Sequence, residues 1–226
     1  GIIGTGFIAT GLMRALKNQP DLDVSCILTR RDINTLSSTE PYTNSIDEFI
    51  DKSQLVVECA GDPIHGTDII GRALAASRPV VTMNAELHVT AGTYLSTLGF
   101  LTEAEGDQPG ALAALHREAL SMGFKPLVYG NLKGYLNHIP SLEDMKYWAK
   151  FQGISLDQVT AFTDGTKLQL EQVLVANGLG TTIARQGLRE EADSLRVPDV
   201  PEIIRQRDAR CSQEAERLLR AKFIVV

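Results

Sequence analysis

A glycine-rich turn at the start of the chain constrains its fold more than any other feature. The turn reads Gly4-Thr5-Gly6-Phe7-Ile8-Ala9, and it lies between an apolar Ile-Ile pair and a segment with helical apolar spacing. A strand, a Gly-x-Gly-x-x-Ala turn and a helix in this order are typical of the dinucleotide-binding fingerprint. Gly4 would allow the tight turn, Gly6 would let the backbone approach a pyrophosphate, and Ala9 would let helix and strand pack closely. A helix N-terminus also offers N–H groups to phosphates. We therefore expect residues 4–8 to contact a dinucleotide.

Glycine-rich turns in other β/α proteins can imitate this motif, so the chain that follows must support it. Apolar runs typical of strands alternate with helical patterns through the first hundred residues, at 23–28, 42–45, 55–60 and 79–83 for strands and at 46–50 and 64–76 for helices. This alternation predicts a parallel sheet covered by helices. The expected fold class is α/β, a doubly wound Rossmann sheet.

The residues after the second expected strand indicate which dinucleotide is bound. A carboxylate at that point would hold the ribose 2′-OH of NAD, whereas an arginine accommodates the 2′-phosphate of NADP. This chain has Arg30-Arg31 there, and the nearest acid, Asp32, follows them. NADP is therefore favoured and NAD stays possible, with a solvated loop as the alternative interpretation. The predicted cofactor contacts are completed by three residues that end or follow later strands: Ala60, Gly61 and Asn84.

Composition narrows the classes of partner. The chain has 226 residues, 43% of them hydrophobic, and a formal net charge of -6, which disfavours nucleic acid and anionic membrane surfaces. No apolar run approaches the ~20 residues of a membrane span. Its three cysteines are odd in number and far apart, and no Cys/His cluster has zinc-ligand spacing, so free thiols in a reducing compartment are expected. A cytoplasmic enzyme acting on a small molecule fits these totals.

Three polar clusters in the second half of the chain are candidates for chemistry. The first, Glu105, Asp107 and Gln108, lies at an expected strand-to-helix turn, which is the edge where ligands bind to doubly wound sheets. Asn131 and Lys133 follow an apolar run at 124–130 that is predicted to be a buried strand, and Asp164 and Lys167 begin a helix that continues to residue 178. Asp107 and Asp164 can also be explained as helix caps. Lys167 opposes the dipole in the first turn of its helix, which indicates a ligand or acid–base role.

Hydride transfer to or from nicotinamide leaves one proton for the protein to manage. A lysine suits this task because burial can lower a lysine pKa toward neutrality. Lys133 and Lys167 are therefore the candidate acid–base residues, and Asp164 or Glu105 could orient them. Further polar groups of a substrate could be bound by Asp107, Gln108 and Asn131.

Three stretches follow the N-terminal fingerprint in a fixed order. They are residues 103–110, residues 130–134, and residues 163–167 together with 175–178. In this respect the chain resembles the homoserine dehydrogenase-like oxidoreductases that often carry a C-terminal SAF domain. The resemblance implies an NADP-binding Rossmann domain at 1–125, an inserted smaller α+β catalytic and dimerisation domain at 126–185, and a helical return segment at 186–226. It also implies a homodimer or higher homo-oligomer, and we expect the chain to be part of a longer protein.

The homoserine dehydrogenases have an Asn-Lys-Ala turn where this chain has Asn84-Ala85-Glu86, so the substrate is left open. The leading hypothesis is an NADP-dependent oxidoreductase acting on a carbonyl or hydroxyl of a small polar metabolite. One alternative is a reductoisomerase-like enzyme of isoprenoid precursor synthesis. That enzyme would use a divalent metal, but the carboxylates of Glu103, Glu105 and Asp107 match no known metal loop, so no metal ligand is assigned. A non-catalytic dinucleotide-binding regulator is the other alternative.

Overall fold

The computed structural model describes residues 1–36, 39–131 and 136–181, which form parts of two compact units, Gly1–Asp107 and Gln108–Val226. The division falls ahead of the boundary predicted at residue 125. Helix α5 (Gln108–Ser121) accounts for the difference, because it packs against α8 (Thr166–Gly178) in the second unit.

The first unit contains a six-stranded parallel sheet in the order β3-β2-β1-β4-β5-β6. This is the Rossmann strand order, so the expected fold class is confirmed. The strands are short and have these bounds: β1 Ile2–Ile3, β2 Ile27–Leu28, β3 Tyr42–Thr43, β4 Val56–Glu58, β5 Val80–Thr82 and β6 Leu101–Glu103. The helices between them are α1 Phe7–Leu16, α2 Ile46–Lys52, α3 Pro63–Ala75 and α4 Ala85–Leu95, with a 3-10 turn, η1, at Ile33–Thr35.

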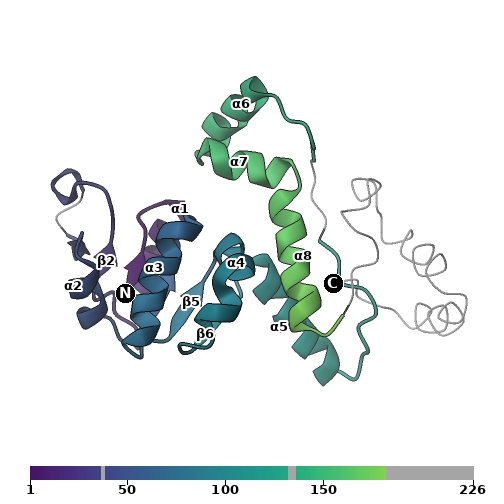
Figure 1. Ribbon diagram of the computed structural model, residues 1–226, viewed down its shortest axis with the longest axis horizontal. Helices are drawn as coiled ribbons and strands as arrows, with labels where there is room; N and C mark the ends of the chain where they lie inside the picture. The colour runs from purple at the N-terminus through teal and green to yellow at the C-terminus, as the bar shows by residue number, and fades with distance from the viewer. Residues whose placement is uncertain (37–38, 132–135, 182–226) are drawn as a thin grey trace, which may run out of the picture. The chain divides into compact units, whose positions relative to one another are not determined.

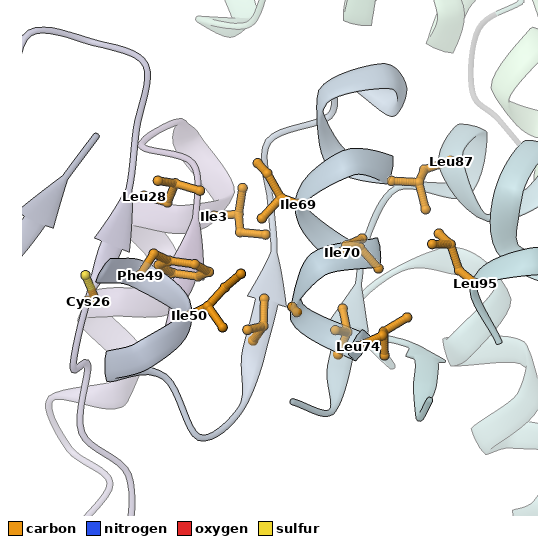
Figure 2. Close-up of a cluster of buried hydrophobic side chains, with 13 residues drawn as sticks. Ile3, Cys26, Leu28, Phe49, Ile50, Ile69, Ile70, Leu74, Leu87 and Leu95 are labelled. Carbon is orange, nitrogen blue, oxygen red and sulfur yellow. The ribbon is translucent and has the colours of Figure 1, made fainter. Parts of the chain in front are cut away.

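Helices cover both faces of this sheet because neighbouring strand residues point to opposite sides. Ile3 and Leu28 face one layer with side chains of α2, α3 and α4, as Figure 2 shows for Phe49, Ile50 and Ile70. Ile2 and Ile27 face the other layer, which α1 covers with Ala9 and Met13. Each fully buried Leu, Ile or Phe contributes about 1.5–3 kcal/mol relative to an exposed one. The double layer therefore fixes the sheet and the loops at its edge.

The described part of the second unit is helical (Figure 1). Besides α5 and α8 it contains α6 (Leu142–Gln152) and α7 (Leu156–Thr163); α6 packs against α7, and α7 against α8. The strand predicted at 124–130 is wrong, since these residues form no ladder. Pro126 lies within the run and has no N–H to donate to a neighbouring strand.

Helix α4 had no counterpart among the helices expected from sequence. Its buried residues include Leu87 and Leu95, but Gly92 and threonines at 90 and 93 interrupt the apolar pattern. Such residues lower helix propensity. Packing against α3 and the cap at Asn84 stabilise this helix instead.

Candidate functional site

The strand order reverses between β1 and β4, which lie side by side and continue in opposite directions across the sheet. In open α/β sheets the ligand binds outside the carboxyl ends of the strands at this point. The glycine-rich turn follows β1 there, and the residues after β4 lie against it. The candidate cofactor site of the first unit is therefore this edge.

The turn has the geometry that a dinucleotide requires. Gly4 has φ +110°, and a Cβ added to it would lie 3.2 Å from the Cα of Ala60. Gly6 has an ordinary φ of −82° and open space where its Cβ would be, and it precedes α1 as the N-cap. No side chain caps α1, whereas side chains cap α2, α3 and α4 of the same unit. The first-turn N–H groups and the space above Gly6 fit a pyrophosphate.

Two of the predicted contact residues in this turn are exposed apolar side chains. Phe7 is 81% exposed and Ile8 is 44% exposed, although both belong to the first turn of a helix packed on the sheet. Thr5 lies with its Oγ1 3.5 Å from Thr29 Oγ1, which joins the turn to the end of β2. Thr29 Oγ1 also accepts the backbone N–H of Arg31 at 3.1 Å.

The side chain of Arg30 reaches across to the loop after β4. One of its guanidinium nitrogens lies 3.0 Å from Asp62 Oδ2, and the Arg30 side chain is 65% exposed. Asp62 also caps α3, because its Oδ1 accepts the N–H groups of Ile64 and His65. These backbone hydrogen bonds, followed by Arg30, hold the pKa of Asp62 below its usual value.

A buried glutamate that sequence analysis did not select organises the loop after β4. Glu58 is fully buried at the end of β4. Its Oε1 accepts the N–H of Ala60 at 2.8 Å and of Gly61 at 3.2 Å, and its Oε2 accepts Thr82 Oγ1–H at 2.9 Å. Burial raises the pKa of Glu58, and these hydrogen bonds lower it in part. Glu58 therefore holds the predicted contact residues Ala60 and Gly61 in place. An acidic residue inside an apolar run was the sequence feature that could have identified Glu58.

Asn84 follows β5 and is almost fully buried. The side-chain oxygen of Asn84 accepts the backbone N–H of Leu87 at 3.0 Å and so caps α4. The backbone N–H of Asn84 donates to Thr82 Oγ1. The β5 and β4 ends are thus joined through Thr82, which bonds to Asn84 and to Glu58.

Lys167 is the candidate that the structure places in a buried polar cluster of the second unit. Its Nζ lies 3.5 Å from Glu171 Oε1, and the Lys167 side chain is only 13% exposed. Glu171 is buried on α8 and accepts Asn131 Nδ2–H at 3.0 Å. The structure thus brings together two predicted residues, Asn131 and Lys167, through a glutamate that the sequence analysis missed. The spacing of four residues between Lys167 and Glu171, which places them on one face of a helix, was the sequence feature that could have identified this glutamate.

The other predicted site residues have separate positions. Asp164 ends α7, its Oδ1 accepts the N–H of Thr166, and its carbonyl lies 3.0 Å from His138 Nδ1. Glu105 is exposed in the turn after β6, where Asp107 is half-buried. Gln108 begins α5 in the second unit. Lys133 lies outside the described residues, as does the segment 186–226.

Within the ranges that the structure describes, no group of three or more His, Cys, Asp or Glu side chains could hold a metal ion. In the same ranges no helix is long and apolar enough to cross a membrane.

Two family models match the chain. The model described as "Homoserine dehydrogenase, NAD binding domain" matches residues 4–107, and "Oxidoreductase DRL, catalytic domain" matches residues 106–219, half of the chain. The chain belongs to the DRL oxidoreductase family. The two matches meet where the compact units divide, and the first indicates that the domain at residues 4–107 binds a nicotinamide dinucleotide.

Solved structures similar to this DRL-family chain include homoserine dehydrogenases. The S. aureus enzyme at pH 7.5 aligns with 80% of this chain and 50% of its own at 15% identity, with a TM-score of 0.51. The same enzyme at pH 6.5 gives the same values, and the Thiobacillus denitrificans enzyme has 18% identity over 75% of this chain and 42% of its own, with a TM-score of 0.47. This chain therefore spans half or less of these relatives, and the likeness to the S. aureus enzyme shows the fold. No curated protein sequence matches the chain.

Proposed function

We propose that this DRL-family protein is an NADP-dependent oxidoreductase that transfers hydride between nicotinamide and a carbonyl or hydroxyl carbon of a small polar metabolite. The observation that carries the proposal is the edge at Gly4–Ile8, where a glycine at positive φ, a second glycine with open space at its Cβ and a helix without a side-chain cap fit a dinucleotide. The bound dinucleotide would supply the hydride, and the protein would bind the metabolite and manage one proton.

Arg30 and Arg31 support NADP as the preferred dinucleotide. Both follow β2, and no acidic side chain occupies the position where NAD enzymes hold the ribose 2′-OH. The ion pair with Asp62 keeps the Arg30 guanidinium next to the loop after β4. A 2′-phosphate would offer Arg30 a second, more highly charged partner at the same edge.

Lys167 is the proposed proton donor and acceptor, with Lys133 as the second candidate. The buried Glu171 carboxylate would orient the Lys167 ammonium, and Asn131 would hold Glu171 in turn. Substrate hydroxyl or carboxyl groups would be bound by Asp107, Gln108 and Asn131, while Asp164 and Glu105 stay candidates for orienting groups. The SAF domain, homo-oligomerisation and cytoplasmic location stay predictions.

The test is turnover of Lys167→Ala and Lys133→Ala, with binding of NADPH measured separately by fluorescence. We expect at least one variant to lose about 100-fold or more in turnover, as removal of an acid–base group does, while NADPH still binds. Lys150→Ala is the matched control, because Lys150 is an exposed lysine on α6. Normal turnover in both variants would exclude the lysine mechanism. NADPH binding without turnover of any sugar phosphate, hydroxy acid or amino aldehyde by the unmodified protein would instead favour a regulator.

A further inference from the structure

Helix α6 of the second unit carries large aromatic side chains that point into solvent. The helix packs against α7, and its Met145 is only 2% exposed. Tyr147 and Phe151 follow Met145 by two and six residues, so at about 100° per residue both lie on the opposite side of the helix. Tyr147 is 62% exposed and Phe151 is 72% exposed. We call the surface formed by these two residues the aromatic face of α6.

The rings of this face are already packed against one another. Tyr147 and Phe151 are stacked, with centroids 6.3 Å apart and planes 10° apart. The Trp148 ring packs edge-on against both, at 5.4 Å from Tyr147 and 5.8 Å from Phe151. Rings that are ordered in advance lose less rotamer freedom when a partner covers them. Because Tyr, Trp and Phe are enriched in the cores of protein interfaces, the aromatic face fits a protein partner.

Charged side chains beside the rings indicate which partner this is. Glu143 lies in the first turn of α6 and Lys150 in its last turn, within about 20° of each other around the helix axis and next to Tyr147. Both are exposed, and among the described residues neither forms an ion pair. Asp144, by contrast, is occupied in the helix cap, where Ser141 donates to it. An acid at one end of a face and a base at its other end make that face complementary to an antiparallel copy of itself.

A two-fold axis near Tyr147 would satisfy both ends at once. Glu143 and Lys150 are seven residues apart, and Tyr147 lies close to their midpoint. In a two-fold interface every contact between two different residues occurs twice. Antiparallel packing would therefore place Glu143 of each copy opposite Lys150 of the other. Parallel packing would place like charges opposite each other, which is unfavourable.

We propose that the aromatic face of α6 binds a second copy of this chain, with the two α6 helices antiparallel about a two-fold axis at Tyr147. The rings would supply the buried apolar surface, about 150–250 Å² for each aromatic side chain. The charge pairs would fix the direction of pairing. One helix from each copy makes a small interface, so the dimer should dissociate on dilution, with a Kd in the micromolar range. The pairing needs neither dinucleotide nor substrate, so its failure would leave the proposed oxidoreductase function untouched.

The experiment is analytical ultracentrifugation of the full chain at concentrations from about 1 to about 300 micromolar. We expect the average mass to rise from that of one chain toward that of two. Phe151→Glu puts a charge into the aromatic face and should abolish the rise. The Phe151 ring is mostly exposed, so this variant should fold, and circular dichroism checks its helix content. A chain that stays monomeric over the whole range overturns the proposal and leaves the face to a different protein. A dimer that Phe151→Glu leaves intact also contradicts it.

Charge reversal tests the antiparallel arrangement. Glu143→Lys and Lys150→Glu should each weaken association by about tenfold or more, because each brings like charges together at both ends of the interface. A mixture of the two variant proteins should associate as the unmodified chain does, since every charge pair in the mixed dimer joins opposite charges. Association that is restored neither in this mixture nor in the double variant would contradict the antiparallel pairing.

Asp157→Lys is the matched control for Glu143→Lys. It makes the same change of charge at an exposed acid in the first turn of the neighbouring helix α7, and it should leave association unchanged. Association weakened equally by Asp157→Lys would assign the effect to net charge and contradict the proposed pairing. Turnover of Lys150→Ala is measured far below the micromolar Kd, where the chain is monomeric, so that comparison does not depend on the dimer.

Discussion

Gly4 and Gly6 are two residues apart in one turn, yet their replacement should have different effects. Gly4→Ala would place a Cβ at φ +110° and 3.2 Å from Ala60. A non-glycine residue in such a conformation costs about 1–3 kcal/mol. Gly6→Ala puts its methyl group in open space at an ordinary φ, so the free energy of unfolding should change little while NADPH affinity falls. Urea unfolding and fluorescence titration measure the two effects. A Gly4→Ala protein as stable as the unmodified one would contradict the requirement for glycine.

Glu58 should make the stability of the protein depend on pH. Its pKa is raised in the folded state above the ordinary value of 4.5, so the folded state binds this proton more tightly than the unfolded chain does. The contribution of Glu58 to stability is therefore fully present below about pH 4.5 and is lost as the pH rises through the higher folded-state pKa.

Glu58→Gln removes this titration and keeps an oxygen that can accept the N–H groups of Ala60 and Gly61. Relative to the unmodified protein, the variant should gain stability as the pH is raised from 4.5 to 7.5. Urea unfolding at these two pH values measures the change. Glu58→Leu, which leaves both N–H groups without an acceptor, should lose about 1–3 kcal/mol for each at either pH. If Glu58→Gln and the unmodified protein keep the same difference at both pH values, Glu58 does not titrate as described.

At the scale of single elements, the start of α3 combines two roles in one side chain. Asp62 caps the helix and also pairs with Arg30. Asp62→Asn should keep the cap, because asparagine caps as well as aspartate, whereas Asp62→Ala should cost about 1 kcal/mol. Loss of the carboxylate charge would free Arg30 for a 2′-phosphate. Asp62→Asn should therefore raise the affinity for NADPH relative to that for NADH, and Arg30→Ala should lower this ratio of affinities.

Titration of each variant with both reduced dinucleotides measures this ratio, and urea unfolding measures the cap. The solvated-loop interpretation of Arg30 predicts the same NADPH to NADH ratio in all three proteins. The opposite signs expected for Asp62→Asn and Arg30→Ala distinguish the two interpretations without knowledge of the substrate.

At the scale of the whole molecule, ligand binding should stabilise the protein through the edge of the first unit. A ligand that binds only the folded state at a free concentration of 100 times its Kd adds about 2.7 kcal/mol. Hydrogen exchange of the full chain should show the added protection at residues 4–10, where α1 has N–H groups without a side-chain cap, and at 59–61. Protection that spares both segments while NADPH is bound would place the dinucleotide elsewhere.

The sequence by itself determined the Rossmann sheet and the glycine-rich turn at its edge, because both depend on local patterns. The period of apolar residues predicts strands and helices, and Gly4 is needed by the backbone of its own turn. The sequence also marked Lys167, because a cation in the first turn of a helix is unfavourable in any fold. The prediction of a strand at 124–130 was wrong because apolar content alone does not supply a neighbouring strand for backbone hydrogen bonds.

Only the tertiary structure decided which distant side chains form hydrogen bonds with one another. Glu58 bonds to Thr82, His88 meets Glu103, and Asn131 meets Glu171 across 24, 15 and 40 residues of sequence. Each of these contacts exists because packing of the sheet or of α8 brings two elements together, and no local period records it. The glycine-rich turn could therefore be predicted from nine residues, whereas the hydrogen-bonding partners of the buried polar residues could be found only in the folded chain.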